Sequence, residues 1–225
     1  MNEQFKIIKN PMDIALEKVY DTIFPNKCLF CKKVLGTITE ITCTDCKRHW
    51  QANLALGHNI PEGLSAVYAP CDYSEAVRRV IIRFKYEEGK RALARPIAKM
   101  IARCMSKIDC DFLLPVPLHK KRIKERGFNQ ARQLATELGR AMNIPAYDGL
   151  VRTKDTVRQY ELDQKERESN MQDAFALKPD FCVKDARVLL VDDILTTGAT
   201  ARECAKILTN AGASSVELVV FAVAI

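Results

Sequence analysis

From residue 65 onward, short apolar segments alternate with amphipathic ones, and this alternation constrains the fold more than any other feature. Apolar runs predict strands at SAVYAPCDY, DFLLPVPL, RVLLVDD and SSVELVVFAVAI. Helical spacing of apolar residues predicts helices at SEAVRRVIIRFKY, RALARPIAKMIARCMSK, NQARQLATELGRAM and TARECAKILTNAG. Strands that alternate with helices indicate an α/β fold, with a mostly parallel twisted sheet covered by helices on both faces.

Four of the nine cysteines form two closely spaced pairs. Cys28, Cys31, Cys43 and Cys46 follow the pattern C-x2-C-x11-C-x2-C. Paired knuckles of this kind hold Zn²⁺ in a tetrahedron of four thiolates, which leaves no position for a catalytic water. Four unrelated thiols, or two disulfides, are the alternative. The chain shows no secretory signal and no apolar run long enough to span a bilayer, so we expect a reducing cytoplasm and a structural zinc.

The first 64 residues lack the alternation of the rest. Residues 12–24 show helical spacing that ends at Pro25, and the four-cysteine segment follows. Gly57, Pro61 and Gly63 give the next stretch the composition of a linker. We therefore expect an N-terminal helix with a zinc-ribbon-like module at 1–50, a linker at 51–64 and the α/β domain at 65–225.

The stretch VLLVDDILTTGAT, residues 188–200, places two carboxylates at the end of a buried strand. Ligands of open parallel sheets bind outside the carboxyl ends of the strands. A helix follows the loop, and a helix N-terminus favours a phosphate. The loop between them supplies hydroxyls and small residues: Thr196, Thr197, Gly198, Ala199 and Thr200. Asp192 and Asp193 are suited to accept hydrogen bonds from a vicinal diol, so diol and phosphate together indicate a ribose 5-phosphate.

Three other interpretations of the aspartates are weaker. A Walker B strand requires a G-x-x-x-x-G-K-[ST] partner, and a dinucleotide fold requires G-x-G-x-x-G; the sequence contains neither. An acidic turn that caps the next helix explains one aspartate, but it explains neither the pair nor the threonines.

The net charge of +7 is concentrated in two stretches. Residues 78–91 carry six basic side chains against two glutamates, and residues 117–126 carry five against one. Such clusters suit a phosphorylated ligand or a nucleic-acid backbone. Each cluster taken alone is also explained as a solvated helix face.

The stretch at 188–200 resembles the phosphoribosyl-diphosphate (PRPP) signature of type I phosphoribosyltransferases. Three further segments, behind a four-cysteine module, resemble the ComF family of phosphoribosyltransferase-like proteins, which is associated with DNA uptake in competent bacteria. The segments are KYEEGKRALARPIA, LLPVPLHKKRIKERGFNQARQLA and RTKDTVRQYELDQKERESNMQDAF.

The resemblance implies roles for individual residues. Asp192 and Asp193 would hold the ribose hydroxyls, and residues 196–200 would hold the 5-phosphate. His119 and Lys120 fall in the expected diphosphate loop, and Arg158 falls in a mobile loop at 152–170 that would contact the diphosphate. Mg²⁺ would accompany PRPP. The resemblance identifies no catalytic residue.

The function we expect is that of a competence protein. We expect it in the cytoplasm, where a peripheral position at the inner face of the membrane is compatible with this function. It would bind PRPP with Mg²⁺ and handle single-stranded DNA, with other components of the uptake machinery or a second copy as protein partners. The expected DNA contacts are Lys120, Lys121, Arg122, Lys124 and Arg126. Phe84, Tyr86 and Phe128 lie beside them as candidate stacking rings, although each ring alone is more simply explained as core. The alternative function is an active phosphoribosyltransferase of nucleotide salvage with an unidentified acceptor.

Overall fold

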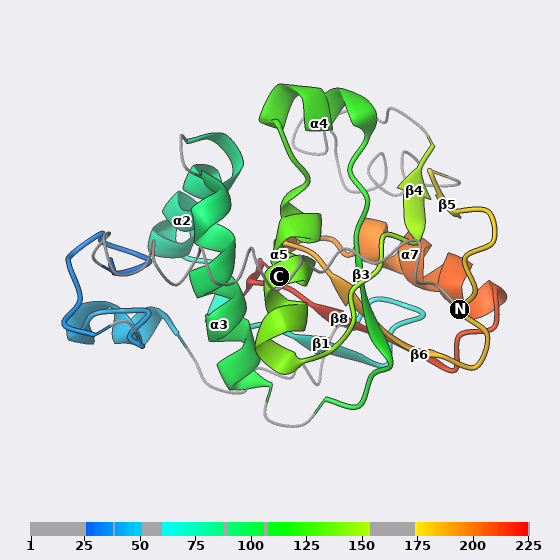
Figure 1. The fold of residues 1–225 in the computed structure, drawn as a ribbon, viewed down its shortest axis with the longest axis horizontal. Coiled ribbons are helices and arrows are strands. Elements are labelled where there is room, and N and C mark those ends of the chain that lie inside the picture. The colour runs from blue at the N-terminus through cyan, green and yellow to red at the C-terminus, as the bar shows by residue number, and fades with distance from the viewer. Residues whose placement is uncertain are drawn as a thin grey trace.

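The computed structural model describes residues 26–37, 39–50, 60–87, 90–105, 108–153 and 174–224 (Figure 1). The helix expected at 12–24 lies outside them. The helices are η2 (Thr44–His49), α2 (Glu75–Tyr86), η3 (Lys90–Leu93), α3 (Ala94–Cys104), α4 (Lys120–Arg126), α5 (Gln130–Met142) and α7 (Ala199–Asn210). The strands are β1 (Ala66–Tyr68), β2 (Cys71–Asp72), β3 (Phe112–Pro115), β4 (Leu150–Arg152), β5 (Phe175–Leu177), β6 (Arg187–Val191), β7 (Ile194–Leu195), β8 (Ser215–Val219) and β9 (Ala222–Val223).

Two parallel sheets form the centre of the domain. The larger has the order β1-β8-β6-β3, and the smaller has the order β2-β9-β7. Each strand of the smaller sheet follows a strand of the larger one after a short break. The predicted parallel α/β fold is confirmed, but two strands expected to be continuous are interrupted. SAVYAPCDY breaks at Pro70, which has no N–H to donate to a neighbouring strand, and SSVELVVFAVAI breaks at residues 220–221.

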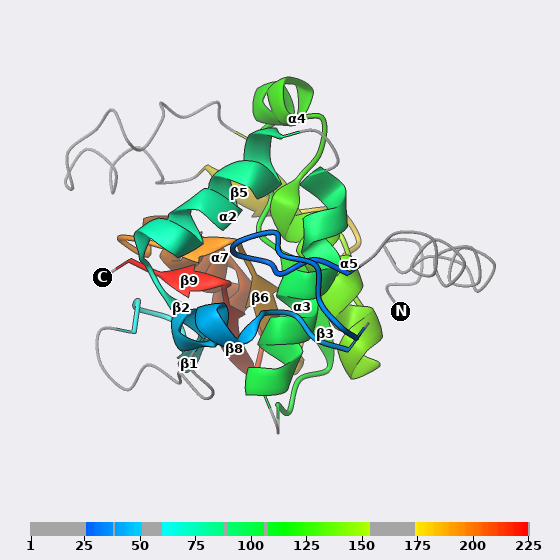
Figure 2. The same ribbon diagram turned by 90° about the vertical axis from the view of Figure 1, so that its left-hand side faces the viewer.

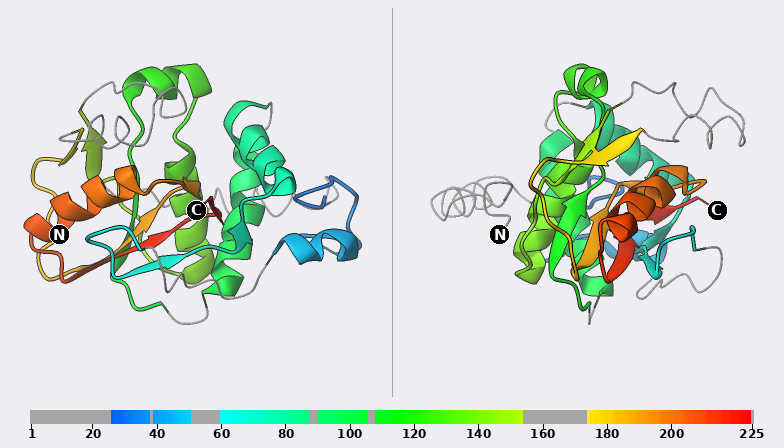
Figure 3. Two further views of the ribbon diagram at one scale, coloured as in Figure 1. Left: turned by 180° about the vertical axis from the view of Figure 1, so that it is seen from behind. Right: turned by 90° about the vertical axis from the view of Figure 1, so that its right-hand side faces the viewer.

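Helices cover both faces of the larger sheet because successive side chains of a strand point to opposite faces. Leu113 and Leu189 pack into one core cluster with buried residues of α2, α3 and α5. Leu114 and Leu190, their neighbours along the strands, pack into a second cluster with α7. Figure 3 shows α7 on the face opposite α3 and α5.

The four-cysteine module packs against α2 and α3 (Figure 2). Leu29, Phe30 and Ile41 are buried in the same cluster as those helices. The Trp50 indole N–H lies 2.9 Å from the Cys104 sulfur. At the end of the expected linker, Pro61 is buried, and Ile60 and Leu64 pack on the core cluster that contains α7.

The sequence patterns did not predict α4 or the antiparallel pair β4–β5. The helix α4 has seven residues, five of them basic, so no apolar period marks it. It ends at Gly127 in the left-handed region, with φ of 79°, as helices commonly do. The pair joins three-residue strands that are far apart along the chain.

Candidate functional site

Asp192 and Asp193 lie in the break between β6 and β7. The Asp192 N–H donates to the Val219 carbonyl at 3.0 Å, and the Phe221 N–H donates to the Asp193 carbonyl at 3.2 Å. These bonds, one to the last residue of β8 and one to the break that follows it, fix the backbone of both aspartates. The offset between the two sheets therefore places the carboxylates at the carboxyl end of β6, where ligands of such folds bind.

The loop after the aspartates ends in a glycine that no other residue can replace without strain. Gly198 is the N-cap of α7 with φ of 76°, and a Cβ at this position would lie 2.6 Å from Pro61 Cγ. The Thr197 hydroxyl accepts a weak hydrogen bond from the Ala199 N–H at 3.5 Å. The first N–H groups of a helix have no acceptor within the helix, and the N-terminus of a helix favours an anion.

A cavity of about 170 Å³, here called the first cavity, brings the two aspartates and the threonine loop together. All seven residues predicted from the 188–200 stretch line it. It also receives side chains from other elements that the sequence did not identify as parts of this site, namely Lys85, Gln130 and Arg152. Residues far apart in the sequence thus add positive and polar groups opposite the carboxylates.

Lys85, from the last turn of α2, forms an ion pair within the first cavity. Its Nζ lies 2.6 Å from Asp193 Oδ2, and Asp193 is buried. Burial, together with the neighbouring charge of Asp193, raises the pKa of Asp192 to about 7; the Asp193 N–H, Lys85 and Arg126 oppose this shift. Near neutral pH, the pair therefore carries one charge balanced by Lys85 and a second carboxyl that exchanges its proton.

The predicted DNA-contacting residues of α4 divide into two groups. Arg122 and Arg126 line the first cavity, and Arg126 donates to Gln130 Oε1 at 3.2 Å and to the Tyr86 hydroxyl at 3.3 Å. Lys120, Lys121 and Lys124 are exposed.

The other predicted positions in this region are also placed. Lys120 lines a second cavity, and the His119 side chain accepts from the Lys121 N–H at 3.4 Å and caps α4. Arg158 lies outside the described residues. Phe84 and Phe128 are buried edge to face at 5.7 Å, so these two rings are core, whereas Tyr86 is exposed.

The four predicted zinc ligands converge at one point. The sulfurs of Cys28, Cys31, Cys43 and Cys46 all lie within 4.8 Å of one another. Cys31 and Cys43 are 3.7 Å apart, close to the separation of about 3.8 Å that a tetrahedron with Zn–S bonds of about 2.3 Å requires. The Cys43 N–H also points to the Cys28 sulfur at 3.4 Å. The cluster can hold a metal ion.

Similarity to known proteins identifies the family of this chain. The phosphoribosyl transferase domain family matches residues 123–224. Competence protein F of Haemophilus influenzae is 31% identical over 189 residues, covering 78% of this chain and 76% of that protein. The chain belongs to the ComF family. DNA utilization protein YhgH of Salmonella typhi is 28% identical, covering 86% of this chain and 95% of that protein. Competence protein ComFC of Bacillus subtilis is 26% identical, covering 82% of this chain and 78% of that protein.

Membership of the ComF family agrees with the architecture described above. The domain has the type I phosphoribosyltransferase fold, a parallel sheet with helices on both faces, and the four-cysteine cluster lies N-terminal to it. Among the described residues, no helix has the length and apolar content needed to cross a membrane.

Proposed function

We propose that this ComF protein binds PRPP in the first cavity. The observation that carries the proposal is that one cavity contains both a carboxylate pair and the N-terminus of a helix. Carboxylates accept hydrogen bonds from hydroxyls, and helix N-terminal amides donate to phosphate. Asp192 and Asp193 would hold the ribose hydroxyls, and residues 196–200 would hold the 5-phosphate.

The basic residues of the first cavity suit the diphosphate of PRPP. Lys85, Arg122 and Arg126 line the same space as the aspartates. Arg126 is held between Gln130 and Tyr86, so its guanidinium is positioned before a ligand arrives. Mg²⁺ prefers carboxylate, phosphate and water oxygens, which PRPP and the aspartates supply, and it would neutralise part of the diphosphate charge.

The proposed biological role is the handling of single-stranded DNA during DNA uptake. Relatives with the names Competence protein F, Competence protein ComFC and DNA utilization protein support this role. Lys120, Lys121 and Lys124 are exposed on α4, a helix that borders both cavities, and can contact a phosphate backbone. We further propose that the four cysteines hold a structural zinc.

PRPP with Mg²⁺ is expected to raise the melting temperature, because a ligand that binds only the folded state stabilises it. Thr200→Val should abolish this shift, since the hydroxyl is lost while the shape is kept. Asp193→Ala should abolish it as well, but it also leaves Lys85 without its partner and should lower the melting temperature of the free protein.

Thr209→Val, at the exposed end of the same helix, is the control and should respond like the wild type. A full PRPP shift in both Thr200→Val and Asp193→Ala would refute the assignment. Release of diphosphate with an added acceptor would place the chain among active phosphoribosyltransferases.

A further inference from the structure

A second and larger cavity adjoins the first. Its volume is about 550 Å³, within the range of small-molecule sites. It is bordered by α4, α5 and β4, and it shares Pro117, Leu118, Asn129 and Arg152 with the first cavity. The proposed contacts of the ribose 5-phosphate lie in the first cavity. Of the expected diphosphate contacts, Lys120 lines the second cavity, and the rest of the lining of that cavity has no ligand assigned.

The second cavity is strongly basic. The basic residues that line it are Arg91, Lys120, Arg132, Arg152 and Lys178. Asp148 is the one acidic residue among its described lining. Lys178 Nζ lies 2.9 Å from Asp148 Oδ2, and Arg132 Nε lies 3.8 Å from the same oxygen. Basic residues thus outnumber acidic ones in the described lining, so the cavity favours an anion such as a phosphate.

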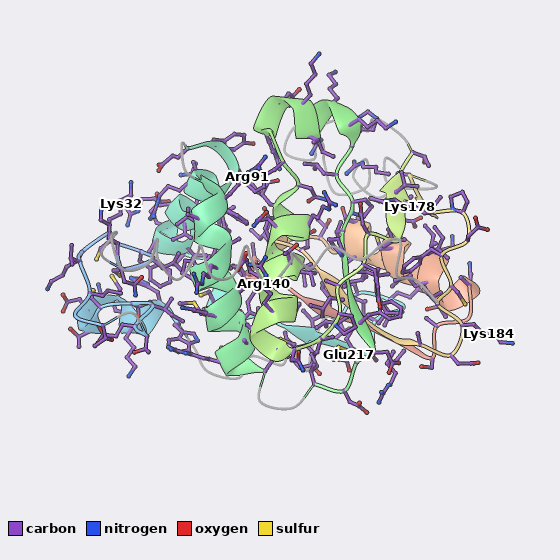
Figure 4. The ribbon with its side chains drawn as sticks, viewed as in Figure 1. Lys32, Arg91, Arg140, Lys178, Lys184 and Glu217 are labelled. Carbon is purple, nitrogen blue, oxygen red and sulfur yellow. The ribbon has the colours of Figure 1, made fainter. Side chains whose placement is uncertain are left out.

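One wall of the second cavity carries a fixed guanidinium plane. Arg91 donates to the Gly127 carbonyl at 2.8 Å, and its guanidinium carbon lies 5.4 Å from the centre of the Phe128 ring. Nucleobases stack on arginine planes that are held in this way. Figure 4 shows Arg91 beyond the end of α2 and Lys178 beside β4, on either side of α5 in that view. A stacking plane and a separate group of cations match the base and the phosphate of a nucleotide.

We propose that the second cavity binds a nucleoside monophosphate unit, either free or within a single strand. The base would stack on Arg91, and the phosphate would lie against Arg132 and Lys178. For the strand-borne unit, this inference rests on the proposed handling of DNA; it does not depend on PRPP binding. It places a nucleotide directly beside the ribose phosphate cavity.

Calorimetric titration with thymidine 5′-monophosphate, a short oligothymidylate and inorganic phosphate tests the proposal. Arg132→Ala should weaken nucleotide binding by about tenfold, as expected for a lost hydrogen bond to a charged group. The change leaves Asp148 paired with Lys178. Arg78→Ala is the matched control, because its side chain is 51% exposed against 54% for Arg132 and lines neither cavity.

Thr200→Val distinguishes binding in the two cavities, because Thr200 lines only the first. This variant should leave nucleotide binding in the second cavity unchanged. Binding of the free monophosphate would identify a free nucleotide as a ligand, and Arg132-dependent binding of the oligonucleotide alone would identify a strand. Equal binding of inorganic phosphate and nucleotide would overturn the proposal. Loss of nucleotide binding in Thr200→Val with retention in Arg132→Ala would also overturn it, because the nucleotide would then occupy the first cavity. The PRPP shift of the same proteins reports independently on PRPP binding.

Discussion

Asp192 and Asp193 occupy the same strand end but have different surroundings. Lys85 neutralises Asp193 at 2.6 Å, whereas Asp192 Oδ1 accepts a hydrogen bond from the Asp193 N–H at 2.8 Å. Burial and the adjacent charge raise the pKa of Asp192 to about 7. At neutral pH the pair therefore presents both a charged acceptor and a carboxyl that can hold a proton, which suits two neighbouring hydroxyls.

The raised pKa makes a prediction about stability. The folded chain keeps the Asp192 proton up to about pH 7, whereas the unfolded chain releases it near pH 4. This contribution to stability is present at low pH and is lost as the pH rises from about 4 to 7. Asn carries no such titration and retains the acceptor oxygen. The free energy of unfolding of Asp192→Asn, relative to that of the wild type, should therefore increase by at least about 1 kcal/mol between pH 5 and pH 8, since one pKa unit is ~1.4 kcal/mol.

Urea unfolding at pH 5 and pH 8 measures this difference. Asp72→Asn, at an exposed carboxylate of β2, controls for the general effect of removing a negative charge. If Asp192→Asn and wild type differ by the same free energy of unfolding at both pH values, Asp192 does not keep its proton in the folded chain.

The residues that sequence reasoning identified are those that lie close together along the chain. The aspartates, the threonines and the cysteine knuckles each form a local pattern whose chemistry can be interpreted directly. Lys85 reaches the aspartates only because the end of α2 packs near the sheet break. Its membership of a basic stretch was the available signal, and that signal could not separate Lys85 from its exposed neighbours Arg78 and Arg79.

At the scale of elements, α2 connects the four-cysteine module with the first cavity. Arg83 donates from its guanidinium to the carbonyls of Leu29 and Phe30 at 2.9 and 3.4 Å, on the first cysteine knuckle. Two residues further along the helix, Lys85 contacts Asp193. A change in the knuckle can therefore shift the end of α2 and alter the position of Lys85.

This connection gives the zinc site a predicted effect on PRPP binding. The purified protein should contain about one zinc per chain, as a closed four-thiolate site requires. Cys43→Ser should lose the metal, lower the melting temperature and reduce the PRPP shift. Cys182→Ser, at an exposed cysteine outside the cluster, should change none of these. Elemental analysis that finds a folded wild type without metal would contradict the zinc assignment.

The alternation of strands and helices was predictable because each long segment repeats one apolar period. The sheet offset was not, because it depends on how three separate strands break together at residues 69–70, 192–193 and 220–221. The helix α4 escaped prediction for a related reason: its five basic residues mask any apolar face, and its end is defined by the backbone of Gly127.

At the scale of the whole molecule, the exposed lysines of α4 belong to a helix that borders both cavities, and we expect them to contact single-stranded DNA. A plot of the logarithm of the DNA-binding constant K against the logarithm of the salt concentration should have a negative slope, which grows by about 0.7 for each phosphate that the protein contacts. Changing Lys121 and Lys124 together to Ala should reduce that slope by about 1.4 and weaken binding equally for all sequences. Fluorescence anisotropy of labelled strands at several salt concentrations provides the measurement.

The matched control for the DNA experiment replaces Lys184 and Lys206, two exposed lysines that line neither cavity. Lys184 lies far from α4 in Figure 4. The proposed DNA surface is wrong if this control variant loses as much of the salt slope as the α4 variant does, or if the wild type shows no salt dependence.

The most direct test of the central claim is a crystal structure of the protein with PRPP and Mg²⁺. Our account predicts that the ribose hydroxyls donate hydrogen bonds to the carboxylates of Asp192 and Asp193. It predicts that the 5-phosphate accepts hydrogen bonds from residues 196–200 at the start of α7. A PRPP molecule whose ribose contacts neither aspartate, or whose 5-phosphate lies in the second cavity, would contradict the account.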